Sequence, residues 1–527
     1  MTTAAPTLSP ALSPPLSPVF PSGALPVARS VVVIGAGTMG SGIAEVAAVA
    51  GHPVVLREAN ASAAQRGIDS IRGNLKRRVA RGKLTAEAAA AALARVRLST
   101  DDAALADAGL LIEVIIENLD IKAQVLRALE PHLAPDCLVA TNTSSISITA
   151  LAARLERPER VVGMHFFNPA PMLPLVEVIA GRATEPAVTA CIVATARAWG
   201  KSPVLCQSTP GFIVNRVARP FYGETLRLLS EQVSDPATLD ALMRDCGGFR
   251  MGACELMDLI GHDINFSVTR SVYEAFFHDP RYRPSLVQKD LVDAGWLGRK
   301  SGRSFFDYRE GAAAPQARSS DIASDIALVV SIEGELGIAA GLGSLLTDCT
   351  AIELQTTVAG SGLIRVNGQV LALTDGRSAA QRAAELGEPV VLFDLALDYD
   401  TATRMAVAAS PLASAAHRAA AVALFAALGK QVSEIADTPG MLVMRTVCML
   451  VNEAADAVHQ GVASEDDVDA AMRKGVNYPI GPMAWGRRIG LPAVAAVLGN
   501  LGASYGEDRY RASPLLAHAA WTQGGRL

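Results

Sequence analysis

The 527-residue sequence has little of what several large classes of protein require. Basic residues do not outnumber acidic ones (47 against 52, net charge −5), so the chain lacks the excess positive charge that neutralises a nucleic-acid backbone. It contains no uninterrupted apolar run long enough for a membrane-spanning helix. The seven cysteines are scattered and form no Cys-x-x-Cys pair, which argues against a zinc site and against a disulfide scaffold. We therefore expect a cytoplasmic protein with reduced thiols, no nucleic-acid partner, no membrane partner and no metal.

What is present is apolar residues in quantity and a distinctive N-terminal segment. Hydrophobic residues make up 50% of the chain, enough for three or four domains with buried cores. Residues 1–28 contain seven prolines and no charged side chain. Such a segment buries too little apolar surface to offset its chain entropy, so we predict a disordered tail.

A glycine-rich loop follows the first predicted strand. The β-branched run at 30–34 is typical of a buried parallel strand and leads directly into Gly35-Ala36-Gly37-Thr38-Met39-Gly40, which precedes a helix. Gly35 permits a tight turn, Gly37 lets the backbone approach a pyrophosphate, and Gly40 allows close packing of helix on strand. The loop therefore predicts a dinucleotide site at a helix N-terminus.

An acidic residue stands where such a site needs one. Glu58 ends the second predicted strand, in the place of a carboxylate that binds the adenosine ribose hydroxyls. That carboxylate would repel a 2′-phosphate, so NAD is the predicted cofactor. Arg57 beside it leaves the preference over NADP open.

Four polar residues farther along the chain follow apolar strands or open a helix. Histidine as a residue type suits the role of a general base, which makes His165 the candidate, and Glu177 is a plausible residue to orient it. Ser144 and Asn215 offer neutral hydrogen bonds for a polarised substrate oxygen. Together they predict oxidation of an alcohol by proton removal and hydride transfer.

Several motifs together make the sequence resemble the NAD-dependent L-3-hydroxyacyl-CoA dehydrogenase family. The resemblance spans about residues 30 to 308. Its motifs are the glycine loop, Glu113 to Glu117 with Asn118 and Lys122, Asn142-Thr-Ser144-Ser, His165-Phe-Phe-Asn168-Pro, Leu175-Val-Glu177-Val, Pro210-Gly-Phe-Ile-Val-Asn215-Arg and Gly295 to Gly302.

This resemblance implies roles for individual residues. It makes His165 the base, Glu177 its carboxylate partner, and Ser144 and Asn215 the contacts of the substrate oxygen. The residues it implies for cofactor binding are Gly35, Gly37, Thr38, Met39, Gly40, Glu58, Glu117, Lys122, Asn142, Ser144, Asn168 and Lys300. The substrate implied is a (3S)-3-hydroxyacyl-CoA. Longer chains of this type resemble the 3-hydroxyadipyl-CoA and 3-hydroxybutyryl-CoA dehydrogenases of aromatic and short-chain acid catabolism.

One segment departs from the family. Where the family has Tyr-Pro-x-Gly-Pro, this chain has Phe249-Arg250-Met251-Gly252-Ala253. The loop shapes the helical domain, so the departure leaves the acyl-chain preference open and does not call the activity into question.

An internal repeat occupies the second half of the chain. Thr209-Pro210-Gly211 recurs as Thr438-Pro439-Gly440, and without gaps 14 of the 53 positions from 209 to 261 are identical. The same offset in numbering places Asp394 at the position of His165, Ala406 at Glu177, Met444 at Asn215 and Leu373 at Ser144. The second copy therefore lacks the catalytic groups.

These observations predict an α/β Rossmann-type dinucleotide-binding domain followed by an all-α helical domain, with a degenerate second copy of the pair. The expected divisions are 1–28 tail, 29–208 NAD-binding domain, 209–309 helical domain, 310–320 linker, 321–429 degenerate Rossmann-like domain and 430–527 second helical domain. The expected assembly is a homodimer, or a monomer in which the duplicate packs on the first helical domain by a pseudo-two-fold.

Two other functions stay open at this point. One is a non-catalytic scaffold that binds NAD or acyl-CoA, which would bind NADH without turning over acetoacetyl-CoA. The other is a CoA-independent hydroxy-acid dehydrogenase, which would accept free 3-hydroxybutyrate.

Overall fold

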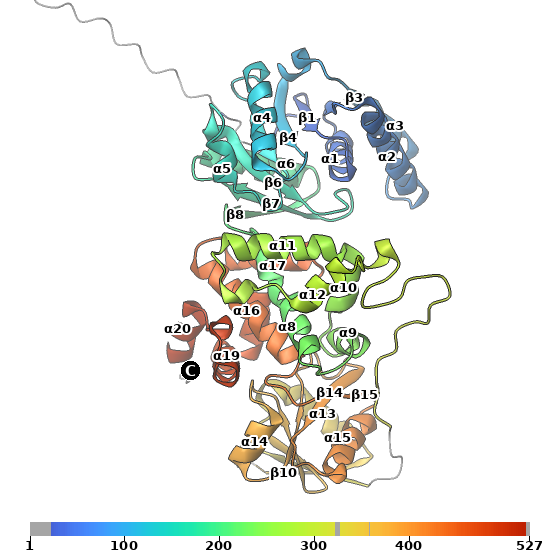
Figure 1. The fold of residues 1–527 in the computed structure, drawn as a ribbon, viewed down its shortest axis with the longest axis vertical. Coiled ribbons are helices and arrows are strands. Elements are labelled where there is room, and N and C mark those ends of the chain that lie inside the picture. Colours follow the sequence, from blue (N-terminus) through green and yellow to red (C-terminus); the bar gives the residue numbers. More distant parts are fainter. Residues whose placement is uncertain (1–19, 21–22, 322–326, 358, 523–527) are drawn as a thin grey trace, which may run out of the picture.

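The computed structural model describes residues 20, 23–321, 327–357 and 359–522. Two β-sheets lie at opposite ends of the molecule, and the helices of two helical domains lie between them (Figure 1). The first sheet with its helices comes first in the chain, followed by a helical domain, the second sheet and the second helical domain. This order confirms the predicted fold class.

The first sheet has eight strands in the order β3-β2-β1-β4-β5-β6-β7-β8. They are β1 Ser30–Ile34, β2 Val54–Arg57, β3 Val96–Leu98, β4 Ala108–Glu113, β5 Leu138–Thr141, β6 Val161–Phe166, β7 Leu175–Ala180 and β8 Ser202–Gln207. All neighbouring pairs are parallel except β6 with β7, and the pairings are those of a doubly wound sheet. Its helices are α1 Thr38–Val49, α2 Ala61–Ala80, α3 Ala86–Ala94, α4 Leu119–Leu129, α5 Ile148–Ala152 and α6 Pro186–Ala198.

The first helical domain follows β8 directly. It consists of α7 Val214–Val217, α8 Arg219–Ser230, α9 Pro236–Asp245, α10 Ala253–Ile260, α11 His262–Ala275 and α12 Leu286–Asp293. Asp240 on α9 accepts hydrogen bonds from the backbone N–H groups of Cys254 and Glu255 at the start of α10. These bonds satisfy donors that have no partner within the helix.

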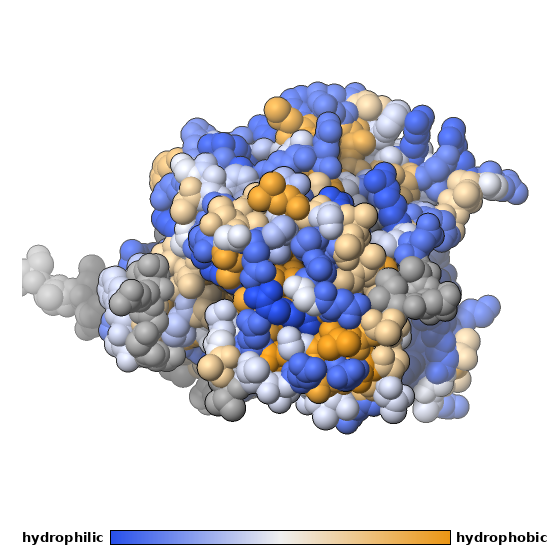
Figure 2. Space-filling view, turned by 90° about the horizontal axis from the view of Figure 1, so that it is seen from below, coloured by the Kyte–Doolittle hydropathy of each residue, from blue (hydrophilic) through white to orange (hydrophobic). Residues whose placement is uncertain are grey.

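The second sheet is shorter and mixed, in the order β10-β9-β11-β12-β13-β14-β15. Its strands are β9 Leu328–Glu333, β10 Ile352–Thr357, β11 Leu363–Val366, β12 Gln369–Leu373, β13 Val390–Phe393, β14 Arg404–Ala409 and β15 Gln431–Glu434, with helices α13 Ala340–Asp348, α14 Ala379–Leu386 and α15 Ala415–Ala427. β11 runs antiparallel to β9, where the first sheet has β4 parallel to β1. Between β10 and β11 no helical pair like α2 and α3 occurs among the described residues. Polar and apolar side chains are mixed on the outer end of this domain (Figure 2).

The second helical domain repeats the first, with the single helix α16 in place of α7 and α8. It consists of α16 Val443–His459, α17 Glu465–Gly475, α18 Pro482–Ile489, α19 Leu491–Tyr505 and α20 Pro514–Thr522. The helices α17, α18 and α19 begin at positions equivalent to the starts of α9, α10 and α11, under the same offset that relates Thr209 to Thr438. Asp469 caps α18 through the N–H groups of Met483 and Ala484, as Asp240 caps α10. The repeat found in the sequence is therefore a repeat of structure.

The two copies are related by a pseudo-two-fold. Helix α8 packs on α16, α17 packs on β7 and β8 of the first sheet, and α9 packs on β14 of the second sheet. Gln207 N–H donates to the Val462 carbonyl (2.8 Å), and Ala436 N–H donates to the Val233 carbonyl (3.0 Å). The two bonds are the same contact made once in each direction, because Gln207 is equivalent to Ala436 and Val233 to Val462 in the repeat.

Two buried ionic clusters lie on this interface, and they are also related by the pseudo-symmetry. Glu453 on α16 accepts bonds from Arg216 (2.6 Å), Arg281 (3.3 Å) and Tyr282 (2.6 Å). Glu224 on α8 accepts bonds from Arg509 (2.8 Å) and Tyr510 (3.1 Å) and pairs with Arg445 (3.5 Å). The contacts of each glutamate cross from one helical domain to the other, so they hold the two copies together.

The end of the predicted tail is packed rather than disordered. Phe20 and Leu25 are both buried against the core of the first sheet, and the Leu25 N–H donates to Thr195 Oγ1 (2.8 Å). Two apolar side chains in a proline-rich segment thus find a hydrophobic surface that the sequence pattern did not reveal. The prediction was wrong for this part, and residues 1–19 and 21–22 lie outside the described residues.

Candidate active site

His165 and Glu177 lie opposite each other on the antiparallel strands β6 and β7. His165 Nδ1 is 2.7 Å from Glu177 Oε2, and both side chains are buried. A carboxylate accepts hydrogen bonds, so the proton of the imidazole lies on Nδ1 and Nε2 carries the lone pair. No hydrogen-bond partner of Nε2 occurs in the part of the chain that the structure describes. The pair is therefore arranged to accept a proton at Nε2.

The other oxygen of Glu177 fixes the start of the helical domain. Glu177 Oε1 accepts hydrogen bonds from the backbone N–H groups of Ile213 (3.0 Å) and Val214 (2.9 Å), where α7 begins. Asn215 is the next residue of that helix. One carboxylate thus ties the imidazole to the helix that carries Asn215.

Ser144 lies in the loop after β5 and binds a second carboxylate. Ser144 N–H donates to Glu117 Oε1 (3.0 Å), and the hydroxyls of Thr143 (2.6 Å) and Ser145 (2.9 Å) donate to the same oxygen. Burial raises the pKa of Glu117, but these hydrogen bonds and the charge of Lys122 outweigh burial and hold the pKa below its ordinary value. Glu117 is therefore an anion that fixes the loop carrying Ser144.

Lys122 is buried beneath this loop. Its Nζ lies 2.7 Å from Glu113 Oε1 and 3.4 Å from Glu117 Oε2, and only 1% of its side chain is exposed. Thr141 Oγ1 donates to the other oxygen of Glu113 (2.6 Å). Lys122 therefore supports Glu117 from within the protein.

The glycine loop between β1 and α1 has the geometry that a pyrophosphate requires. Gly35 has a φ of +103°, and a Cβ there would lie 2.7 Å from the Val114 carbonyl oxygen. A Cβ on Gly40 would clash with the Gly35 carbonyl, whereas a Cβ on Gly37 would meet nothing within 4 Å. Helix α1 begins at Thr38 and Met39 without a side-chain cap, so its N–H groups face open space. The loop fits a dinucleotide at the helix N-terminus.

Glu58 lies beside this loop. Its Oε2 accepts a hydrogen bond from Ala36 N–H (3.1 Å), which places the carboxylate next to the glycines. Arg57 points elsewhere, because it forms an ion pair with Asp102 (2.6 Å). This pairing removes the cation that would have favoured a 2′-phosphate.

Three predicted cofactor-binding residues remain, and the structure places two of them near His165 and the third in the helical domain. Asn142 Oδ1 accepts a hydrogen bond from Phe166 N–H (2.8 Å), next to His165, and Asn168 is exposed just beyond Phe166. Lys300 lies in the helical domain, where it pairs with Asp263 on α11. Among the described residues, no recorded contact joins Lys300 to the glycine loop.

A cavity of about 760 Å³ lies near His165 and Glu177. Phe167, whose ring centroid is 4.6 Å from that of His165, lines it together with Asn168 and Asn215. The helical residues from Ala218 to Tyr222 form another wall, and Gly475 to Tyr478 come from the second copy. No signal in the sequence indicated that the second copy contributes to this wall.

Family models match almost all of the chain. The NAD binding domain of 3-hydroxyacyl-CoA dehydrogenase matches residues 30–209, and the C-terminal domain of 3-hydroxyacyl-CoA dehydrogenase matches 211–308 and again 440–523. The chain belongs to the 3-hydroxyacyl-CoA dehydrogenase family. Residues 371–439 match the reduced Rossmann-fold domain of 3-hydroxybutyryl-CoA dehydrogenase, which agrees with the shortened second sheet.

Relatives and solved structures agree with the family assignment. The chain is 45% identical to the 3-hydroxyadipyl-CoA dehydrogenase of Escherichia coli K12, over 94% of this chain and 98% of that protein. It is 41% identical to the 3-hydroxybutyryl-CoA dehydrogenase of Bradyrhizobium diazoefficiens, over 55% of this chain and 98% of that protein. A crystal structure of 3-hydroxybutyryl-CoA dehydrogenase from Escherichia coli K12 superimposes with a TM-score of 0.86 at 44% identity, covering 94% of this chain and 99% of that one.

The reaction and the cofactor follow from this membership. The protein is an NAD-dependent dehydrogenase that oxidises 3-hydroxyacyl-CoA. No helix among the residues placed by the structure is both long and apolar enough to cross a membrane. Those residues also contain no group of three or more His, Cys, Asp or Glu side chains arranged to bind a metal ion.

The position of His165 has a different use in the second copy. Asp394 stands there, at the end of β13, and its Oδ2 accepts hydrogen bonds from the N–H groups of Leu442 (2.9 Å) and Val443 (2.7 Å). These two residues are the counterparts of Ile213 and Val214, which Glu177 holds in the first copy. Asp394 thus performs the helix-anchoring contact of Glu177 from the position of the histidine.

Proposed function

We propose that His165 is the general base of the dehydrogenase and that Glu177 positions it. The observation that carries this proposal is the 2.7 Å contact between His165 Nδ1 and Glu177, which leaves Nε2 available beside the cavity. In the oxidation, the substrate hydroxyl gives its proton to Nε2 as its O–H bond breaks, and Glu177 stabilises the imidazolium that forms. When bound, NAD accepts the hydride that leaves the carbon bearing this hydroxyl.

Ser144 and Asn215 hold the substrate oxygen in this proposal. Both side chains are neutral, so they can donate to the oxygen as negative charge develops without competing for the proton. Glu117 fixes the loop of Ser144, and Glu177 fixes the start of the helix of Asn215. The two donors are therefore preorganised by separate carboxylates.

The dinucleotide site is built on the glycine loop. We infer that the backbone N–H groups of Gly37, Thr38 and Met39 face the pyrophosphate. Gly35 supplies the tight turn, with its own N–H bonded to the Arg57 carbonyl, and Gly40 allows the helix to pack closely on the strand. Glu58 binds the ribose hydroxyls. The residues that we assign to the rest of the cofactor are Glu117, Asn142, Ser144, Asn168 and Lys300. Lys122 acts through Glu117, since its ammonium group is buried against two carboxylates.

The substrate is a (3S)-3-hydroxyacyl-CoA with a short acyl chain. The relatives' names divide between 3-hydroxyadipyl-CoA, which ends in a second carboxylate, and 3-hydroxybutyryl-CoA, which does not. The oxidation of NADH measured against a series of 3-oxoacyl-CoA thioesters, with and without a terminal carboxylate, tests this function. Absence of turnover with every thioester, or equal turnover of free 3-oxo acids, would overturn it.

We also propose that the protein is a cytoplasmic monomer whose second copy replaces a partner subunit. The pairing of α8 with α16 and the two buried ionic clusters support this assembly, because such contacts commonly join subunits. A chain truncated after Tyr308 exposes the covered face of α8 and should dimerise or aggregate. A monomeric, equally stable fragment would contradict the proposal.

A further inference from the structure

Arg219 is a buried cation without an acidic partner. It is 7% exposed, and its guanidinium donates to the Asn215 carbonyl oxygen (2.7 Å) and to Thr269 Oγ1 (2.9 Å). No carboxylate of the described residues lies within ion-pair distance of it, whereas Arg216 on the same helical segment is paired with Glu453. Burial lowers the pKa of Arg219 for this reason. A buried charge without a partner is costly, and the fold retains it.

Arg219 is one of the residues that line the 760 Å³ cavity, together with Asn168 and Asn215. The other side chains around this cavity are apolar or neutral, apart from Arg250 on the exposed loop where the sequence departs from the family. The cavity therefore has positive charge and no negative charge of its own.

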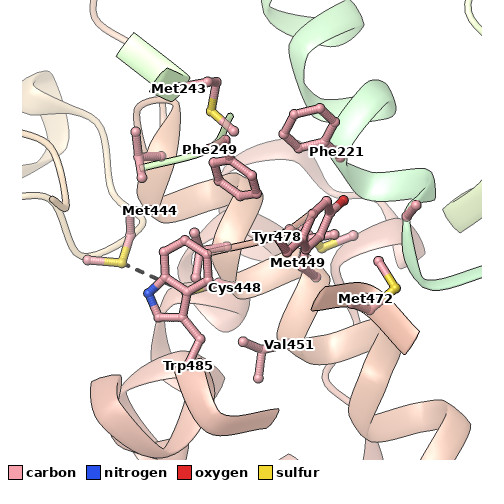
Figure 3. Packing of buried hydrophobic residues seen from close by; sticks show 14 of the residues in the cluster. Phe221, Met243, Phe249, Met444, Cys448, Met449, Val451, Met472, Tyr478 and Trp485 are labelled. Atoms are coloured by element: carbon pink, nitrogen blue, oxygen red, sulfur yellow. Dashed lines mark hydrogen bonds between the residues drawn. The ribbon is translucent and has the colours of Figure 1, made fainter. Parts of the chain in front are cut away.

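A second polar group that lacks a partner among the described residues also lines this cavity. Tyr478, contributed by the second copy, lines the cavity, and its buried hydroxyl forms no hydrogen bond with any described residue. Its ring packs beside Phe221 and Phe249 in Figure 3. Burial raises the pKa of this hydroxyl, and the charge of Arg219, which lines the same cavity, opposes that rise.

The scaffold does not require an arginine at this position. The counterpart of Arg219 in the second copy is Cys448, and the counterpart of Asn215 is Met444. These two pack against each other through their sulfur atoms in an apolar environment (Figure 3). The arginine therefore occurs only in the copy that has the catalytic pair.

The spacing suits a particular acyl chain. Asn215 and Arg219 lie one turn apart on two helices that are nearly continuous. Residues four apart share one face of a helix, with their Cβ atoms about 5–6 Å apart. A chain held at its 3-oxygen by Asn215 and extended by a few carbons reaches the guanidinium. Arg219 also borders a smaller cavity of about 300 Å³. The other charged residues that line it are four arginines and two glutamates (Arg227, Arg281, Arg283, Arg509, Glu231 and Glu507), and three of these arginines already pair with carboxylates.

We infer that this site takes 3-hydroxyacyl-CoA substrates whose acyl chain ends in a carboxylate, bound by the Arg219 guanidinium and the Tyr478 hydroxyl. The inference rests on the proposed function and deepens it. It gives the second copy a part in specificity, since Tyr478 belongs to that copy.

The first test uses variants and two substrates. Arg219→Met should lower kcat/KM for 3-oxoadipyl-CoA by about 30-fold or more and leave kcat/KM for acetoacetyl-CoA within about threefold. Tyr478→Phe should lower the dicarboxylic value alone, by about tenfold. Arg182→Met is the control, because Arg182 is exposed and lies away from the cavity. Equal losses with both substrates, or no loss with either, would overturn the inference.

The second test needs no variant and decides the question if Arg219→Met does not fold. The wild-type enzyme is assayed with 3-oxoadipyl-CoA and with its terminal methyl ester, which has the same chain without the charge. The inference expects kcat/KM for the ester to be lower by about 30-fold or more. Comparable turnover of both would overturn this inference alone, whereas no turnover of any 3-oxoacyl-CoA would overturn the proposed function as well.

Discussion

The two copies in this chain keep the same framework around very different sites. In the first copy, Glu177 binds the His165 imidazole with one oxygen and anchors the start of the next helix with the other. In the second copy, Asp394 alone anchors the helix, and the position of Glu177 holds Ala406. The comparison shows that both copies place a buried acceptor at this helix start, whereas only the first copy has the pair of His165 and Glu177.

The residues that hold the framework together are the same in both copies. Asp240 and Asp469 cap equivalent helices, and Glu224 and Glu453 hold equivalent clusters of arginine and tyrosine. Each of these residues is identical in the two copies. Scaffold and site are therefore separable, and the identities that revealed the repeat in the sequence belong to the scaffold.

The largest expected effect is on kcat and comes from His165, whose counterpart in the second copy is Asp394. His165→Gln removes the proton acceptor and should lower kcat by about 10²–10⁴, while NADH binding persists. The matched variant at the equivalent position, Asp394→Asn, should leave kcat within about twofold. Steady-state kinetics with acetoacetyl-CoA and NADH titration by fluorescence measure both. Near-normal turnover of His165→Gln would remove His165 from the mechanism.

The next effect tests whether the two halves of the interface are equivalent. Glu453→Gln leaves Arg216 buried without its anion and removes one of the two carboxylates that pair with Arg281, so it should lower the free energy of unfolding by about 3–5 kcal/mol. Glu224→Gln should cost a similar amount, measured by chemical denaturation.

Glu274→Gln serves as the control for this pair of variants. Glu274 pairs with Arg270 on the exposed surface of α11, so its loss should cost less than about 1 kcal/mol. A large cost for one buried glutamate and none for the other would contradict the pseudo-symmetric account of the interface.

Much of this architecture could be predicted because it depends on local sequence. The glycine loop, Glu58 and the order of strands and helices follow from residues close together in the chain. The repeat followed from Thr209-Pro210-Gly211 and its counterpart, since one constant offset in numbering holds over the helical domain.

The remainder depended on contacts between distant segments. The approach of Tyr478 to the cavity of the other copy follows from docking of the two halves. Leu25 is buried only because its hydrogen-bond acceptor and its hydrophobic surface are supplied by residues far along the chain. The prediction of a degenerate Rossmann-like domain did not specify that β11 runs antiparallel to both β9 and β12.

A smaller effect concerns Glu58, which follows the second strand and lies beside the glycine loop. Glu58→Ala should weaken NAD binding by about 10-fold to 100-fold and narrow the preference over NADP, because the ribose hydroxyls lose a charged acceptor. The matched control is Glu335→Ala in the second copy, where an exposed glutamate follows β9. That variant should leave NAD affinity unchanged by calorimetry. A wild-type preference for NADPH would instead show that Arg57 governs the site.

The smallest expected effect is the pH dependence of the buried acceptor in the second copy. Burial raises the pKa of Asp394 to about 6, against hydrogen bonds from Met444, Val443 and Leu442 that lower it. Since the folded protein binds this proton more tightly than the unfolded chain, the contribution of Asp394 to stability is present below about pH 4 and is lost as the pH rises through about 6. Asp394→Asn lacks the titrating group, so its free energy of unfolding relative to wild type should rise by about 1–2 kcal/mol between about pH 4 and pH 7. Denaturation at a series of pH values measures the difference, and a constant difference would show that Asp394 is an ordinary anion on this helix.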